Sequence, residues 1–155
     1  MSAQREPAPV QLRPMRTSDI DAVMEVERAA YPYPWTAGIF RDCLRIGYCC
    51  WIAEADDGVA GYVVMSVGAG EAHLLNLCVA PARQRTGLGR MMLDHVFELA
   101  RSHRAKALFL EVRPSNDAAL HLYRVAGFVE VGLRNNYYPA ARGQREDAIV
   151  LALPL

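Results

Sequence analysis

One short segment combines basic residues with glycine in a way that could bind an anion. The stretch Gln84-Arg85-Thr86-Gly87-Leu88-Gly89 precedes an amphipathic run that ends at Ser102. A glycine-rich turn at the start of a helix exposes main-chain N–H groups without helical partners, and the helix dipole adds partial positive charge. Arg83, Arg85 and Arg90 add charge nearby. The segment predicts a phosphate-binding turn; the alternative is a helix that merely begins with glycine.

Two familiar nucleotide-binding turns do not match this segment. The chain has no G-x-x-x-x-G-K-[ST] pattern, which argues against a Walker-type nucleotide triphosphatase. It has no G-x-G-x-x-G with an acidic residue about 20 positions later, which argues against a dinucleotide site. The 17 Lys and Arg residues balance the 17 Asp and Glu residues, so any attraction to an anion has to be local.

Two other residues could transfer protons. Glu111 lies in the apolar run 107–112, where alternation turns its side chain away from its leucine and valine neighbours. It is either a general base in a cleft or an ordinary surface residue paired with Arg113. Tyr123 lies seven residues after Asn116, close to two helical turns, so both face one side of a helix. Tyr123 is either functional or part of the core.

The spacing of apolar residues predicts the elements that must position these side chains. Helix 20–30 carries Ile20, Val23, Met24, Val26 and Glu27 at helical spacing. Thr36 can cap the second helix, and Asp56-Asp57-Gly58 predicts a hairpin turn. Helices are expected over 20–30, 36–45, 87–102 and 116–126, and strands over 10–15, 48–55, 59–67, 73–79, 107–112, 128–133 and 148–153. This order predicts one mixed α/β (α+β) domain.

Aromatic and charged residues cluster in two connecting segments. The first is YPYPW, which ends at Trp35; the second, 134–147, contains Arg134, Tyr137 and Tyr138. These four residues could line a peptide groove, or they could be ordinary core and loop packing. Glu146 and Asp147 belong either to a solvated charged segment or to a contact with a basic peptide.

The remaining features bound the class of protein. The chain has 155 residues, of which 52% are hydrophobic and 22% charged, as expected for a soluble globular domain. Residues 1–9 resemble a flexible tail before a domain over 10–155, with no signal peptide and no membrane span. We therefore expect a cytoplasmic protein. The four cysteines lack metal-ligand spacing and are expected to be free core thiols, without a metal site.

The glycine-rich turn resembles a known motif. Residues 84–89 match Q/R-x-x-G-x-G/A, the pyrophosphate loop of the GCN5-related N-acetyltransferase (GNAT) superfamily, which binds acetyl-coenzyme A. The order of elements is similar as well, which implies a mixed, mostly antiparallel central sheet flanked by about four helices. The resemblance implies that acetyl-CoA contacts the main chain of the preceding strand and residues of the loop and following helices: Leu77, Cys78, Val79, Arg85, Thr86, Gly87, Leu88, Gly89, Arg90 and Asn116.

A closer resemblance covers the chain from about residue 10 onward. The stretches LEVRPSNDAALHLYRVAGF, RNNYYP and REDAIVLALPL, with the early YPYPW, are similar to bacterial RimI-type enzymes. Those enzymes acetylate the N-terminal alanine of a small-subunit ribosomal protein. The resemblance gives Glu111 the role of general base and Tyr123 that of the acid that protonates the leaving thiolate. It implies direct transfer in a ternary complex, so an acetylated Cys78 is not needed.

The expected function is therefore acetylation of a protein N-terminus, with acetyl-CoA as cosubstrate and a ribosomal protein as partner. No direct contact with nucleic acid or membrane is expected. Two alternatives stay open. One is acetylation of a small amine or antibiotic, and the other is an acyl-CoA-binding module without catalysis.

Overall fold

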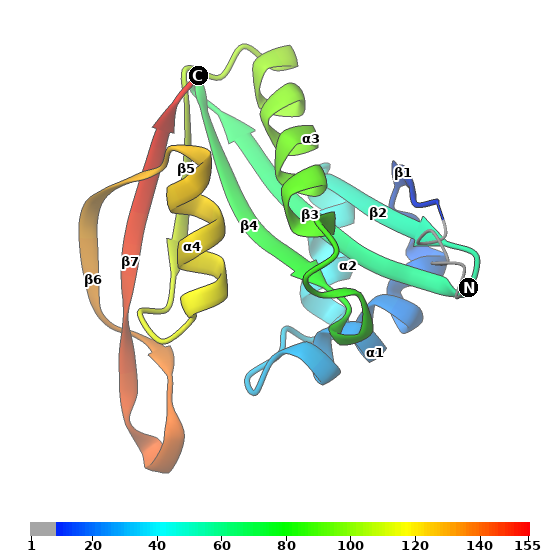
Figure 1. Cartoon of the computed structure of the whole chain (residues 1–155), viewed down its shortest axis with the longest axis horizontal. Helices are drawn as coiled ribbons and strands as arrows, with labels where there is room; N and C mark the ends of the chain where they lie inside the picture. Colours follow the sequence, from blue (N-terminus) through cyan, green and yellow to red (C-terminus); the bar gives the residue numbers. More distant parts are fainter. Residues whose placement is uncertain (1–8) are drawn as a thin grey trace, which may run out of the picture.

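Seven strands form one sheet in the order β1-β2-β3-β4-β5-β7-β6 (Figure 1). The computed structural model describes residues 9–155, so the predicted tail over 1–9 lies almost wholly outside the described residues. Neighbouring strands are antiparallel except for β4 and β5, which are parallel. The predicted mixed, mostly antiparallel sheet is confirmed.

The elements agree closely with the apolar spacing in the first 126 residues. The strands are β1 (Gln11–Pro14), β2 (Cys49–Ala55), β3 (Gly58–Gly68), β4 (Glu71–Val79), β5 (Ala107–Val112), β6 (Val129–Pro139) and β7 (Arg145–Pro154). The helices are α1 (Ile20–Ala30), α2 (Ala37–Ile46), α3 (Leu88–Ser102) and α4 (Asp117–Ala126), with three short 3₁₀ turns between elements. Thr36 caps α2 as predicted, because its side chain accepts a hydrogen bond from the Ile39 N–H.

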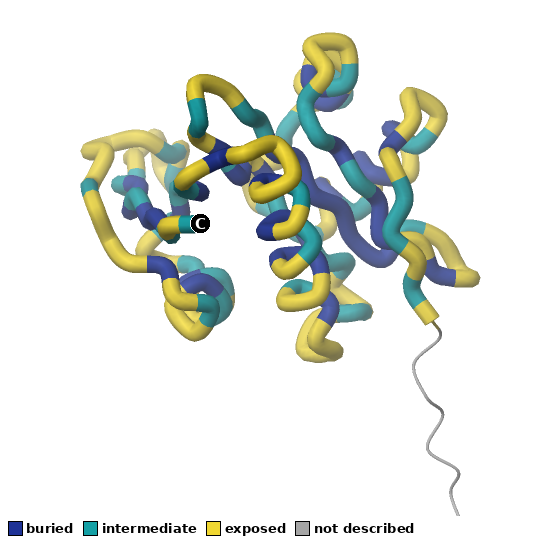
Figure 2. The backbone as a smooth tube through the Cα atoms, turned by 90° about the horizontal axis from the view of Figure 1, so that it is seen from above, coloured by how far each residue is buried: buried dark blue, intermediate teal, exposed yellow. Residues whose placement is uncertain are grey.

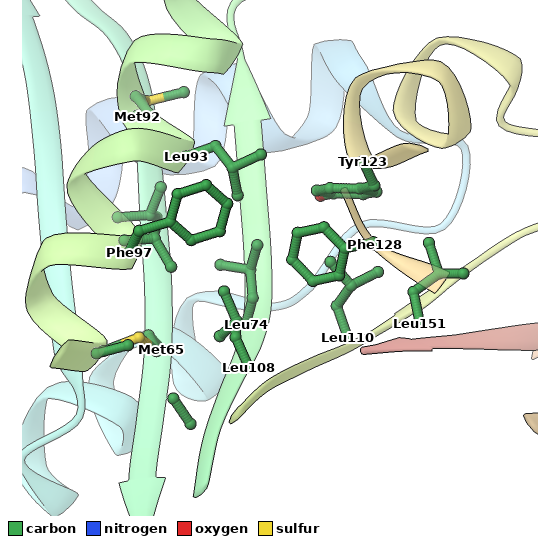
Figure 3. Packing of buried hydrophobic residues seen from close by; sticks show 14 of the residues in the cluster. Met65, Leu74, Met92, Leu93, Phe97, Leu108, Leu110, Tyr123, Phe128 and Leu151 are labelled. Atoms are coloured by element: carbon green, nitrogen blue, oxygen red, sulfur yellow. The ribbon is translucent and has the colours of Figure 1, made fainter. Parts of the chain in front are cut away.

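Helices cover the sheet from both sides, and each side has its own core. The α3/α4 core joins Leu93 and Phe97 of α3 to inward residues of the central strands such as Leu110 (Figure 3). The α1/α2 core includes Phe40 and Tyr62. Figure 2 shows that the most buried parts of the backbone run along the strands between these helices. Alternation along each strand divides its side chains between the two cores.

The C-terminal hairpin is longer than predicted. The sequence predicts strands over 128–133 and 148–153 with a long connection, but β6 and β7 extend through that connection and leave only 140–144 as the turn. Two register shifts interrupt the pairing, one between Glu130 and Gly132 and one between Arg134 and Tyr138. The first shift inserts one residue and the second inserts two, so the period-two pattern is interrupted in the sequence although the strand continues.

An inserted residue also shapes the centre of the sheet. Val64 pairs with Asn76 while Met65 pairs with Leu74, so Leu75 is the extra residue of a bulge in β4. Before the bulge, Leu74 faces the α3/α4 core, and after it Cys78 faces the α1/α2 core. A bulge bends and twists its strand. β4 and β5 pair only up to Leu74 and Leu110 and then separate (Figure 1); we call this separation the split.

A buried carboxylate fixes the bulged half of β4. Glu27 on α1 is 1% exposed. Its Oε1 accepts hydrogen bonds from the Tyr62 hydroxyl at 2.7 Å and from Asn76 Nδ2 at 3.0 Å, and its Oε2 accepts one from the Trp35 N–H at 2.9 Å. A buried carboxylate is tolerated when several donors satisfy it. One side chain therefore connects α1, β3, β4 and the segment that leads to α2.

Two further sequence expectations can be compared with the fold. All four cysteines are free, and Cys43, Cys50 and Cys78 are buried, which confirms that they serve as small core residues. Within residues 9–155, no helix has the length and apolar character needed to span a membrane.

Replacing Glu27 tests the importance of this connection. Glu27→Ala leaves three buried donors without an acceptor, so we expect unfolding free energy to fall by roughly 3 kcal/mol or more. Glu27→Gln keeps one acceptor oxygen and should cost about 1–2 kcal/mol. Urea unfolding measures both values. Glu25→Ala, on the exposed face of α1, is the control and should stay within about 0.5 kcal/mol. A loss for Glu27→Ala no larger than for the control would contradict this role.

Candidate active site

The split leaves main-chain groups of β4 open. Ala80 donates its N–H to the Ala60 carbonyl, and Cys78 lies opposite Tyr62 in the same ladder. In an antiparallel pair, the main-chain groups of every second residue form hydrogen bonds to the neighbouring strand. Those of Cys78 are therefore directed toward β3, whereas those of Leu77 and Val79 point into the split. The Leu77 carbonyl accepts a hydrogen bond from the Tyr31 hydroxyl at 3.0 Å. Of the three predicted residues, Leu77 and Val79 therefore have the suitable orientation.

The glycine-rich turn ends at the mouth of α3. Gly87 is the N-cap, with φ of +84°, and the helix begins at Leu88, one residue later than predicted. The first N–H to bond within the helix is that of Met91, which donates to the Gly87 carbonyl. The N–H groups of Leu88, Gly89 and Arg90 thus precede the helical ladder. A Cβ on Gly87 would meet no atom within 4 Å, so the space beside this N-cap residue is open.

The three arginines near this turn are not equivalent. Arg83 pairs with Asp57, and Arg90 Nε lies 2.9 Å from Asp94 Oδ1. Among the described residues no carboxylate pairs with Arg85, which is exposed and has φ of +64°. The Thr86 hydroxyl donates to the Arg83 carbonyl at 2.6 Å and so stabilises the turn. Arg85 is therefore the arginine best able to meet an anion.

Glu111 lies where β5 leaves β4. It is the first residue after the last β4–β5 pair, and its side chain faces away from the α3/α4 core, as alternation predicts. The side chain is 15% exposed, so it is not an ordinary surface residue. Its Oε1 lies 2.9 Å from Arg134 Nε and 3.7 Å from His73 Nε2. Glu111 thus pairs with Arg134, and not with Arg113 as in the alternative to a general base.

Tyr123 approaches the split from the other face. Its ring packs edge-on against Phe128 at 5.5 Å in the α3/α4 core (Figure 3). Burial, and secondarily the nearby Tyr138, raise the pKa of Tyr123 well above its ordinary value. Burial, and then the charge of Glu111, raise the pKa of Tyr138 to about 12. Tyr123 is therefore a neutral hydroxyl at the split, close to Tyr138, which is in turn close to Glu111.

Two residues assigned to the cofactor have visible structural roles. Asn116 is the N-cap of α4 and accepts a hydrogen bond from the Ala119 N–H at 3.2 Å. Burial raises the pKa of the Cys78 thiol to about 11, and its side chain belongs to the α1/α2 core. A buried, protonated thiol is a poor nucleophile, which agrees with the expectation that Cys78 carries no acetyl group.

Arg113 joins the two segments that flank Glu111. Its guanidinium lies 4.4 Å from the ring centre of Tyr138 and 5.3 Å from that of Tyr33. It donates to the Pro139 carbonyl at 2.7 Å and pairs with Glu146 at 3.2 Å. Cation–π contacts and hydrogen bonds thus hold the α1–α2 connection against the β6–β7 hairpin. Sequence reasoning missed this function of Arg113.

The acidic pair of β7 also acts inside the molecule. Glu146 accepts hydrogen bonds from both the N–H and the hydroxyl of Ser115, each at 2.9 Å. Burial opposes ionisation of Glu146, but these hydrogen bonds and Arg113 outweigh it and lower its pKa. Asp147 accepts a hydrogen bond from the N–H of Asn136. Asn136 has a φ of +51° and lies in the irregular part of β6. Neither carboxylate belongs to a merely solvated segment.

The irregular part of β6 presents three of the four predicted groove residues. Arg134 and Tyr137 are largely exposed, and their guanidinium and ring centre are 5.4 Å apart. The rings of Tyr137 and Tyr138 pack edge-on at 4.9 Å. The ring of Trp35 instead lies 5.2 Å from that of Phe40 in the α1/α2 core. Contact of these four residues with a substrate stays a prediction.

Sequence signals existed for some of the residues that were missed. Glu27 falls on the apolar stripe of α1, where a charged residue is unusual and indicates a buried partner. His73 and Tyr33 have no such signal, because their positions follow from strand pairing and from the fold of the α1–α2 connection. Together the residues offer a donor-rich helix mouth, an open strand edge, a carboxylate on one face and a neutral phenol on the other.

This arrangement can be compared with known proteins. The acetyltransferase (GNAT) family model matches residues 20–128. The chain is 40% identical over 141 residues to the ribosomal protein bS18-alanine N-acetyltransferase of Salmonella typhimurium, a match that covers 91% of this chain and 95% of that protein. The crystal structure of the ribosomal-protein-S18-alanine N-acetyltransferase from Escherichia coli superposes with a TM-score of 0.87 at 36% identity, covering 94% of each chain.

A more distant structure shares the fold. A Bacillus subtilis acetyltransferase in complex with CoA has a TM-score of 0.78 at 20% identity, covering 95% of this chain and 99% of that one. The family model spans most of the chain, and the relatives at 36–40% identity match nearly all of it. This chain therefore belongs to the acetyltransferase (GNAT) family.

Proposed function

We propose that this protein transfers the acetyl group of acetyl-CoA to the α-amine of a protein N-terminus that begins with alanine, with a bS18-type ribosomal protein as the substrate. One observation carries the chemistry: Glu111 and Tyr123 approach the split from opposite faces of the sheet. The relatives with 36–40% identity, which are ribosomal protein alanine N-acetyltransferases, support the choice of substrate.

The helix mouth is suited to the diphosphate of acetyl-CoA. The N–H groups of Leu88, Gly89 and Arg90 and the charge of Arg85 would bind its oxygens. The main-chain groups of Leu77 and Val79 that point into the split would pair with the amides of the pantetheine arm, as an added strand does, with the Leu77 carbonyl also accepting from Tyr31. The thioester is then delivered to the split, between Glu111 and Tyr123.

The acceptor amine must be neutral to attack. Glu111 takes a proton from the ammonium, directly or through a water molecule, and the amine nitrogen then forms a bond with the thioester carbon. The carbon–sulfur bond breaks, and the electron pair leaves with the sulfur. Because Tyr123 is neutral and buried, it donates a hydrogen bond and finally a proton to that sulfur. The second proton of the former ammonium leaves the nitrogen through water as the amide forms, and a proton from water restores the Tyr123 hydroxyl, so that one proton is released overall. The pKa of an α-amine, near 7.7–8.0, makes it an easier acceptor than a lysine near about 10.4.

Mass spectrometry of peptides incubated with acetyl-CoA tests this choice of acceptor. At pH 7.5 a peptide with a free N-terminal alanine should react roughly 100-fold or more faster than an N-terminally blocked peptide with an internal lysine, because far more of the α-amine is neutral. Tyr137→Ala and Tyr138→Ala should slow the peptide reaction. Faster acetylation of a small amine, unaffected by these two changes, would favour a small-molecule acetyltransferase instead.

Substitution of the predicted catalytic pair distinguishes a role in catalysis from a role in binding alone. Glu111→Gln and Tyr123→Phe should each lower kcat by about 10²-fold or more while the affinity for coenzyme A stays within about twofold. Since the pKa of Tyr123 is raised, its ionisation should not reduce the wild-type rate up to about pH 10. Steady-state kinetics and calorimetry measure these quantities. Unchanged kcat in both variants would indicate an acyl-CoA-binding module without this chemistry.

The helix mouth has its own test. Gly87→Asp introduces a carboxylate in front of the N–H groups, and aspartate tolerates the left-handed backbone at this position better than most residues. Coenzyme A affinity should fall roughly 100-fold with the fold preserved. Gly89→Ala is the control, because its Cβ would make ordinary contacts of 3.5 Å with Leu122 and 3.7 Å with Val79. If calorimetry finds equal affinity for both variants, the diphosphate binds elsewhere.

A further inference from the structure

The carboxylate assigned as the base already has a cationic partner within the protein. Four ionisable side chains face Glu111: His73 from β4, and Arg134, Tyr137 and Tyr138 from β6. Of the two charge contacts to Glu111, that of Arg134 is the shorter, 2.9 Å from its Nε to Glu111 Oε1, against 3.7 Å for His73. A guanidinium at this distance occupies the place in which an acceptor amine would have to meet the same oxygen.

Arg134 is nevertheless weakly held. Its side chain is 54% exposed, although that of Glu111 is only 15% exposed. It stands on the edge strand β6, at the start of the register shift that runs from Arg134 to Tyr138. Its guanidinium also contacts the half-exposed ring of Tyr137. An ion pair with one exposed partner is weak, so the guanidinium can leave at little cost.

The arriving substrate carries a cation of its own. An α-amine with a pKa near 7.7–8.0 is mostly an ammonium at neutral pH. An ammonium can replace a guanidinium on a carboxylate, because both donate N–H groups and both carry one positive charge. A neutral alcohol or amide offers no charge to compensate for the lost ion pair. Exchange of one cation for another therefore favours acceptors that arrive charged.

We propose that Arg134 is a positioning residue: its guanidinium occupies the acceptor-amine site beside Glu111 in the free protein and is displaced by the ammonium of the substrate. This inference rests on the proposed function of Glu111. Once the guanidinium has moved away, the carboxylate faces the ammonium and takes one of its protons. The neutral amine then attacks the thioester carbon as described, and Arg134 returns when the acetylated product, whose new amide is uncharged, leaves.

The experiment compares Arg134→Gln with wild type on two peptides. One begins with alanine, and the other is identical but has hydrogen in place of the N-terminal amine. Calorimetry is done with the protein saturated by an inert ketone analogue of acetyl-CoA, in which a methylene replaces the sulfur. Because the amine peptide no longer has to displace a cation, its affinity should rise about fivefold in Arg134→Gln, whereas that of the other peptide should not change.

Kinetics give a second readout. For the alanine peptide, Arg134→Gln should lower KM about fivefold with kcat within twofold, and Arg134→Lys, which keeps a cation, should return KM toward wild type. Arg142→Gln, an exposed residue of the turn between β6 and β7, is the matched control and should change neither quantity. In a Glu111→Gln background the effect of Arg134→Gln on affinity should disappear.

The outcomes separate the inference from the proposed function. If wild type acetylates the alanine peptide but Arg134→Gln weakens both peptides equally, Arg134 only supports the wall of the groove and the inference is wrong. The inference is also wrong if Arg134→Gln alters the binding of neither peptide. If wild type neither binds nor acetylates the alanine peptide, the proposed function itself fails.

Discussion

The carboxylate of Glu27 holds together the part of the molecule on which the site depends. It accepts hydrogen bonds from Tyr62 on β3, from Asn76 just after the β4 bulge and from the N–H of Trp35. The bulge turns Asn76 toward α1 and lets β4 separate from β5, and Glu27 supplies the partner that makes this turned side chain stable in the interior. The open strand edge and the α1–α2 connection therefore share one anchor.

The two side chains proposed to act on the thioester lie on opposite faces of the sheet. Tyr123 belongs to the α3/α4 core, where burial keeps its hydroxyl neutral, whereas Glu111 points to the face lined by β6. Arg113 supports the proposed acceptor face, since its guanidinium contacts the rings of both Tyr33 and Tyr138. Because β4 and β5 separate, side chains from distant parts of the sequence can meet at the split.

What the sequence could predict follows from the range of each interaction. The glycine turn, the helix that follows it and the strand that holds Glu111 are defined by neighbours a few residues apart, and their positions were predicted to within a residue or two. The partners of Glu27 lie as far as 49 residues away, so its position on an apolar stripe indicated burial but not its role. The extended hairpin was missed because two register shifts hide its alternation. Arg134 could be proposed as a groove residue, but its pairing with Glu111 depends on that hidden register.

The two halves of the site also differ in what substitution can change. The proposed cosubstrate side consists mainly of main-chain groups, at Leu77, Val79 and the first turn of α3, and a substitution leaves these in place unless it disturbs the backbone. Gly87 is constrained by its positive φ, whereas Gly89 has room for a methyl group, which is why the motif admits Gly or Ala at its last position. The acceptor side consists of side chains from an exposed, irregular hairpin, and each can change without loss of the strand. With the proposed assignment, such a fold can keep its cosubstrate while its acceptor varies, so the glycine turn identifies the family, and the contacts around Glu111 have to identify the substrate.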